Sequence, residues 1–164
     1  MPPRRRRKRS RPSKVAAARN FETIESLNNA NSGKLPRHMG LVVTRVEPGL
    51  VEWRFDVRND LVAHTGYLLA GAVLSVADIL CAYGVSTVWP EGATGFTTAK
   101  VKCNFVGTVQ AGVVDCSARL LHGGRTAQVW DANVTAAATG KLMAAFRCTQ
   151  ILLYPRPPAP APAI

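Results

Sequence analysis

Apolar side chains recur along the chain in two different rhythms. In residues 15–29 they return every three or four positions, which is the spacing of a helix with one buried side. In residues 50–57 they alternate with charged residues, as in a strand with one buried and one solvated face. A strand-like run over residues 40–46 precedes this strand, and the turn Glu47-Pro48-Gly49 between them predicts a tight hairpin.

The most apolar stretch covers residues 70–84 and has almost no polar side. A helix of this composition has to be surrounded by protein, and Gly84 is a natural residue for its C-terminal cap. A loop over residues 59–68 is expected before it. Four strand-like runs separated by turn residues follow it, namely residues 95–106, 112–121, 126–135 and 141–153.

This order of elements predicts an α+β fold in which an antiparallel sheet curls around one long apolar helix. Residues 15–154 form the predicted domain. Residues 1–14 are rich in Arg and Pro and residues 155–164 in Pro and Ala, so both are expected to be disordered tails. The edges of an open sheet stay unpaired, so we expect two copies to join at edge strands.

The chain of 164 residues carries a formal net charge of +11. Eight of its 21 Lys and Arg residues lie between Arg4 and Lys14, which leaves 13 basic against ten acidic residues elsewhere. The basic balance therefore belongs to a terminal segment. That segment predicts at most salt-sensitive, non-specific phosphate contacts, and no nucleic-acid-reading motif accompanies it. A solvated tail and an organelle transit peptide are the open alternatives.

The cysteine and histidine content argues against a metal or redox site. The four cysteines lie far apart in apolar stretches, and the three histidines are scattered, so neither forms a metal-binding pattern. Free cysteines fit a reducing compartment. No secretory signal or apolar run of about 20 residues is present, so we expect a cytoplasmic protein without a membrane anchor.

Asp78 is the anomaly in the apolar helix. Aspartate is a poor residue for a helix interior, and burying its charge is costly without partners. Such carboxylates concentrate at active sites, so Asp78 is the candidate reactive group. The alternative is a structural carboxylate at a subunit seam or one that points into solvent.

The start of the same helix offers a second chemical element. Gly66, Tyr67 and Leu69 lead into it, and the N–H groups of Ala70 and Gly71 have no partner inside the helix. With the helix dipole they form a candidate oxyanion hole. Asp78 lies about two turns further on, or ~11 Å of rise, which is too far for one chain to place both groups on one carbonyl. A site shared between two subunits fits this spacing.

The segment from Gly66 to Asp78 resembles the G-x-L-H-G-G-x-x-x-x-L-A-D motif of hotdog-fold thioesterases, of the phenylacetate-catabolism (PaaI-like) and 4-hydroxybenzoyl-CoA thioesterase group. The family's acid lies nine positions after its His, and Asp78 lies nine after Leu69. Three downstream segments also resemble family elements and extend the resemblance over residues 35–154. They are Lys102-Cys103-Asn104-Phe105, Gly124-Arg125-Thr126 and Phe146-Arg147-Cys148-Thr149.

The resemblance implies a thioesterase that hydrolyses a small aromatic or medium-chain acyl-CoA. It makes Asp78 the nucleophile or the general base, and it makes the Ala70 and Gly71 N–H groups of the other subunit the oxyanion hole. Coenzyme A enters as part of the substrate, without a further cofactor. A homodimer or a tetramer is implied. The residues implied to contact the substrate or its coenzyme A are Gly66, Tyr67, Leu69, Asn104, Arg125 and Thr126.

Two departures from the motif weaken the expected polar support. Leu69 occupies the position of the family's His and cannot donate a hydrogen bond. A family Gln or Asn falls on Ala63, and the neighbouring His64 is the candidate substitute, with a surface-loop histidine as the alternative. A catalytically weakened module that binds acyl-CoA or acts as a scaffold is therefore the alternative function.

Overall fold

The computed structural model describes residues 23–155, so both predicted tails lie outside the described residues. A short helix, α1 (Ile24–Ala30), is followed by α2 (Leu35–His38) and the 3₁₀ turn η1 (Asn59–Leu61). The long helix α3 (Ala70–Thr87) separates the first two strands from the last four. The strands are β1 (Val42–Glu47), β2 (Leu50–Asp56), β3 (Gly95–Phe105), β4 (Val113–Gly123), β5 (Ala127–Ala136) and β6 (Leu142–Leu153).

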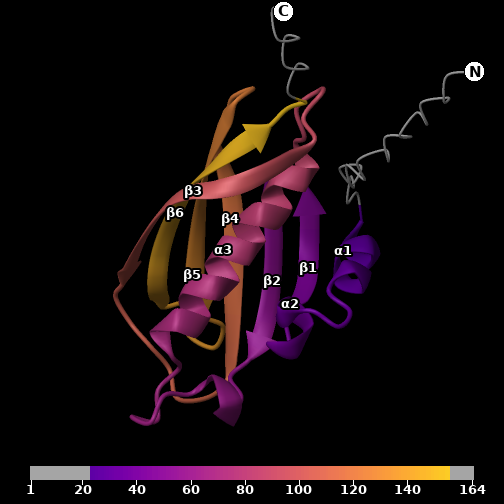
Figure 1. Ribbon diagram of the computed structural model, residues 1–164. Helices are drawn as coiled ribbons and strands as arrows, with labels where there is room; N and C mark the ends of the chain where they lie inside the picture. Colours follow the sequence, from indigo (N-terminus) through magenta and orange to yellow (C-terminus); the bar gives the residue numbers. More distant parts are fainter. Residues whose placement is uncertain (1–22, 156–164) are drawn as a thin grey trace, which may run out of the picture.

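The six strands form one antiparallel sheet in the order β1-β2-β4-β5-β6-β3. Helix α3 lies across one face and contacts every strand from β2 to β6, as Figure 1 shows. The predicted hotdog architecture, a curved antiparallel sheet around one long apolar helix, is therefore confirmed. The predicted hairpin is also present, because Glu47 pairs with Leu50 across a two-residue turn.

The core is the space between α3 and the concave face of the sheet. Val76, Ala77 and Leu80 on α3 are fully buried, and Trp53 on β2 and Trp130 on β5 pack from the sheet side. Burial of such side chains stabilises each by about 1.5–3 kcal/mol relative to exposure. Helix α3 also has the length and composition of a membrane-crossing helix, two criteria that a core helix wrapped by a sheet meets as well.

The two edges of the sheet differ. At β1, the Asn28 side chain of α1 accepts from Val43 N (2.9 Å) and donates to Val43 O (3.4 Å), so the helix occupies the edge. At β3, no described residue covers the outer edge, and most side chains of the strand are exposed. An unpaired edge strand is a template for another strand. The single chain therefore has one closed and one open edge.

Two local predictions need correction, and one helix was not predicted. Thr23 has extended backbone angles and caps α1 through a reciprocal pair of bonds with Ser26, so one helix cannot run from residue 15 through to residue 29. The helix that was not predicted is α2, with Pro36 early in the helix, where the missing N–H of proline costs nothing. The predicted loop before α3 begins with η1.

The C-terminal end predicted for the long helix is also wrong. Helix α3 continues through Gly84 to Thr87, and Gly84 is buried in the helix interior. A Cβ atom on Gly84 would overlap the ring of Trp130. Glycine is present there because the helix and the sheet approach closely, and not because the helix has to end.

Gly84→Ala should therefore destabilise the fold by about 1–3 kcal/mol, because a methyl group would be forced into a packed core. Gly71→Ala is the matched control in the same helix, since a Cβ there meets only Leu69 at 3.8 Å. Urea denaturation followed by circular dichroism measures both. Equal stability of the two variants would contradict the packing role of Gly84.

Candidate active site

Asp78 lies in the middle of α3, on the side that faces the open β3 edge. Thr98 of β3 donates its hydroxyl proton to Asp78 Oδ1 at 3.2 Å. The carboxylate is partly exposed in the single chain, so the expectation of a buried carboxylate needs correction. The physical reason is its place on the helix, because it projects toward the edge where the sheet ends. The carboxylate is therefore both partnered and accessible.

A row of polar groups runs from Asp78 through the exposed Thr98 into the core. The Thr98 hydroxyl also lies 3.1 Å from Gln150 Oε1 on the neighbouring strand, and Thr98 and Gln150 are register partners between β3 and β6. Gln150 is fully buried, and its amide nitrogen lies 3.4 Å from Cys148 Sγ. Cys148 in turn contacts Cys81 of α3, and a hydrogen bond to Cys148 together with burial raises the pKa of the Cys81 thiol. Polar groups thus extend from the core to the carboxylate.

The start of α3 is an exposed helix N-terminus without a side-chain cap. Leu69 occupies the N-cap position and is 50% exposed, and Ala70 and Gly71 are exposed beside it. The first N–H groups of a helix lack partners inside the helix and carry its positive end. Within one chain this end lies about two helical turns from Asp78, which agrees with the spacing in the sequence.

The loop before α3 is held in a fixed shape. Val62 and Leu68 form an isolated antiparallel bridge, and Ala63 N donates to Tyr67 O at 2.8 Å to close a turn. His64 and Gly66 lie in this exposed turn, and Gly66 has the positive φ of 84° that glycine adopts readily. Within residues 23–155, His64 makes no contact with Asp78. Its part in a site remains a prediction.

Arg125 and Thr126 lie in the turn between β4 and β5, at the end of the molecule where α3 finishes. The Arg125 guanidinium stacks over the Tyr154 ring at 5.1 Å, and the Tyr154 hydroxyl donates to Arg125 O at 2.5 Å. Both Arg125 and Thr126 are exposed. The turn therefore holds Arg125 as a fixed, accessible cation. Within one chain Arg125 does not reach Asp78.

Asn104 lies on the opposite face of the sheet from α3. Its β3 position pairs with Ala145, and it lines a shallow polar hollow with Lys102, Asp131, Asn133 and Arg147. Arg147 donates to Asp131 at 2.6 Å in this hollow. The structure therefore does not bring Asn104 together with Asp78 in a single chain, and its contact with coenzyme A remains a prediction.

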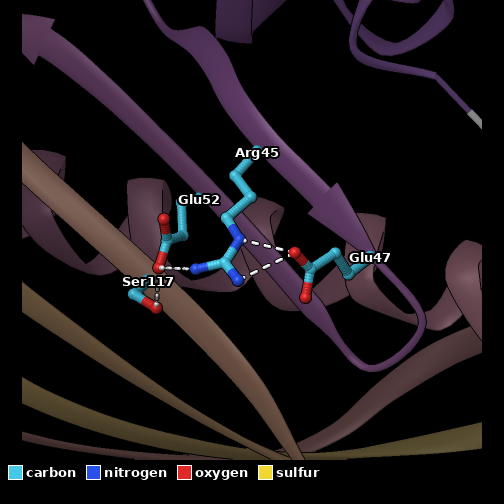
Figure 2. A network of polar contacts seen from close by, with 4 residues as sticks. All are labelled: Arg45, Glu47, Glu52 and Ser117. Carbon is cyan, nitrogen blue, oxygen red and sulfur yellow. Dashed lines mark hydrogen bonds and ion pairs between the residues drawn. The ribbon is translucent and has the colours of Figure 1, made fainter.

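A network of ion pairs and hydrogen bonds lies on β1, β2 and β4. Arg45 bridges Glu47 at 2.8 Å and Glu52 at 3.9 Å, and Ser117 donates to Glu52 at 3.2 Å, as Figure 2 shows. The hydrogen bond and charge of Glu47 raise the pKa of Arg45. Exposed pairs of this kind contribute little to stability. Because every member of this network has a charged or hydroxyl partner, it offers no free reactive group.

The fold and this arrangement of groups match known proteins. The family model of the thioesterase superfamily matches residues 65–143, a span that begins just before α3 and ends in β6. Over this span the chain is similar to the thioesterase superfamily. The match includes Asp78, the start of α3, Thr98 and the turn that carries Arg125.

Two curated relatives match most of the chain. The chain is 27% identical over 115 residues to a 1,4-dihydroxy-2-naphthoyl-CoA hydrolase of Listeria monocytogenes, and the match spans 70% of this chain and 92% of the relative. It is 28% identical over 109 residues to the proofreading thioesterase EntH of Klebsiella pneumoniae, covering 66% and 79%.

Solved structures agree with the fold of this chain. A mutant thioesterase of Pseudomonas aeruginosa matches with a TM-score of 0.76 at 22% identity, over 82% of this chain and 96% of that one. Thioesterase superfamily member 2 of zebrafish matches with a TM-score of 0.72 at 22% identity, over 79% and 98%. At these identities the likeness shows the fold.

The sequence pattern predicted the carboxylate and the helix start as candidate site elements, which stay predictions, but neither Thr98 nor Gln150 was predicted. One signal was present in the last strand. Its inward positions Phe146, Cys148 and Leu152 are apolar or nearly so, and Gln150 interrupts them. A polar residue at an inward position of a buried strand needs a partner, and here that partner leads to Asp78.

Proposed function

We propose that this protein hydrolyses an acyl-CoA thioester to a free acid and coenzyme A. The observation that carries the proposal is the partnered and accessible Asp78 beside the open sheet edge. Water adds its oxygen to the thioester carbonyl carbon, the carbon–sulfur bond breaks, and the departing sulfur takes a proton. Asp78 either takes the proton of the attacking water or attacks the carbonyl itself before water releases the acid.

The oxyanion formed in this step needs donors that Asp78 cannot supply. The N–H groups of Ala70 and Gly71 are exposed at the positive end of α3 and fit this role. They lie two turns away in the same chain, so the proposed site uses the helix start of a second subunit. Two α3 helices that run in opposite directions across a two-fold axis place each helix start near the other chain's Asp78.

The open β3 edge supports a homodimer as the assembly that completes the site. The β1 edge is blocked by Asn28, which leaves β3 as the unpaired edge, and Val101 and Phe105 on β3 are 45% and 47% exposed. A second β3 strand would pair with this edge and cover both side chains. A tetramer formed from two such dimers is a further proposal, as is a cytoplasmic location.

An aromatic or medium-chain acyl group is the proposed substrate class. Tyr67 and Leu69 present apolar surface beside the helix start, with exposed fractions of 44% and 50%. One relative is named as a hydrolase of an aromatic acyl-CoA, which favours an aromatic acyl group. Arg125 is proposed to meet a phosphate of coenzyme A, because a guanidinium binds phosphate oxygens in pairs.

A weakened module that binds acyl-CoA without efficient turnover is the second candidate. Leu69 favours it, because the N-cap residue of α3 makes no side-chain hydrogen bond and offers no donor to a thioester. Loss of one donor of this kind lowers the rate by about 10²–10³-fold. This second candidate function uses the same site as the proposed thioesterase and differs from it only in the rate of hydrolysis.

Asp78→Asn should lower kcat/KM by about 10²-fold or more on every ester that the wild type hydrolyses, since the amide is neither a base nor a nucleophile. The rate of hydrolysis is measured as release of free thiol from benzoyl-, phenylacetyl-, hexanoyl- and decanoyl-CoA. Asp131→Asn is the matched control, because Asp131 pairs with Arg147 on the outer face. Equal rates for wild type and Asp78→Asn would exclude the mechanism.

Leu69→His should raise kcat about 10- to 100-fold if the missing donor limits the rate. Leu69→Phe, which adds a ring without a donor, is the control and should give no gain. The same thiol-release assay measures both, with calorimetry for acyl-CoA binding. Binding without any gain from Leu69→His would favour the non-catalytic module.

Val101→Asp should convert the dimer to a monomer and lower hydrolysis at least about tenfold, because a charge on the paired edge repels its copy. Leu121→Asp is the control, since Leu121 is 57% exposed on β4, well away from β3. Light scattering after size exclusion gives the mass of each variant. A Val101→Asp monomer with full activity would show that one chain holds the complete site.

A further inference from the structure

The Thr98 hydroxyl is in contact with two acceptors and has one proton. Asp78 Oδ1 lies 3.2 Å away and Gln150 Oε1 lies 3.1 Å away, so three oxygens share a single hydrogen. One of the two contacts then joins two lone pairs, which is repulsive. Meanwhile the Gln150 amide nitrogen, with two hydrogens, lies against Cys148 Sγ at 3.4 Å, and sulfur is a weak acceptor.

A half-turn of the Gln150 amide group removes this conflict. The oxygen and nitrogen of a carboxamide have nearly the same shape, so the hydrogen-bond partners decide which way it points. After the turn, the nitrogen donates to Thr98 Oγ1 and the Cys148 thiol donates to Gln150 Oε1. The Cys81 thiol, which contacts Cys148, can then donate to Cys148 Sγ. Each contact in the row has one donor and one acceptor.

We infer that Gln150 is a positioning residue for Asp78, because its amide nitrogen occupies the Thr98 oxygen and thereby commits the single Thr98 proton to the carboxylate. The inference rests on the proposed function, since it states how the reactive carboxylate is held. Gln150 is fully buried between β3 and β5 and touches no solvent, so it acts through Thr98. Thr98 contacts Asp78 directly.

The second buried glutamine of the sheet shows what a purely structural role looks like. Gln128 is 1% exposed and is the register partner of Gln150 between β5 and β6. Its amide donates to Val88 O at 3.0 Å and accepts from Trp130 Nε1 at 3.0 Å, so it joins the end of α3 to the core. Gln128 has the same side chain, the same burial and the same rung of the sheet, yet its contacts do not lead to Asp78.

The test is kinetic and uses the full chain with the most reactive acyl-CoA ester. Gln150→Met should lower kcat about tenfold with KM changed less than about twofold, because the Asp78 carboxylate loses the hydrogen bond that Thr98 is held to donate. Gln128→Met should keep kcat within about twofold of wild type while lowering the melting temperature.

A double mutant separates action through Thr98 from general damage. Thr98→Val removes the hydroxyl at constant shape and should itself lower kcat, and Thr98→Ser should restore it. In the Thr98→Val background, Gln150→Met should change kcat less than about twofold, because the hydroxyl through which Gln150 acts is already absent. Wild-type kcat in Gln150→Met, or a tenfold loss that persists in the Thr98→Val background, would overturn the inference.

Failure of the proposed function gives a different pattern. If Asp78→Asn and Thr98→Val hydrolyse every ester at the wild-type rate, the thioesterase mechanism falls, whatever Gln150 does. Neutron diffraction on the deuterium-exchanged wild-type protein then tests the inference without an activity assay. Deuterons on the Gln150 nitrogen that point at Thr98, and a Thr98 deuteron that points at Asp78, support it. The Gln150 oxygen facing Thr98 would overturn it.

Discussion

The structure depends on one apolar helix that the sheet has to cover. Helix α3 has almost no polar side, so burial of its Val, Leu and Ala side chains fixes where all six strands go. The sheet covers one side of the helix, where nine of its 18 residues are buried, and ends at β3. Asp78 is the charged residue of the helix and lies toward that end. The constraint that builds the core therefore also leaves the carboxylate at the border between protein and solvent.

The two sheet edges explain why one chain is only part of the proposed site. Asn28 satisfies the free backbone groups of Val43 and closes the first edge, whereas β3 presents unpaired groups and exposed Val101 beside Asp78. Edge strands of this kind are usually blunted or paired. In the proposed dimer, assembly and chemistry use the same surface, because the pairing that covers β3 would also bring a second helix start toward the carboxylate.

The periodic features of the fold were predictable from sequence, and the features that depend on distant contacts were not. Alternation fixed all six strands to within a few residues, and the apolar run fixed α3. The helix end predicted at Gly84 was wrong, because a glycine that ends a helix and a glycine that packs against the Trp130 ring cannot be distinguished in a single sequence. The Thr98–Asp78 contact was missed because it joins residues 20 positions apart through the packing of α3 against β3. Nothing in the local pattern of β3 sets Thr98 apart.

Polar support in this protein is distributed unevenly over the two halves of the proposed chemistry. The oxyanion side has backbone N–H groups and an apolar Leu69, so the helix dipole carries the stabilisation there. The carboxylate side has a hydroxyl and a buried amide arranged in series behind Asp78. A buried amide held by its neighbours needs no reorganisation when charge moves, which is the property that makes a polar site effective. The absence of a side-chain donor at one end of the site therefore places more weight on the orientation of the carboxylate at the other.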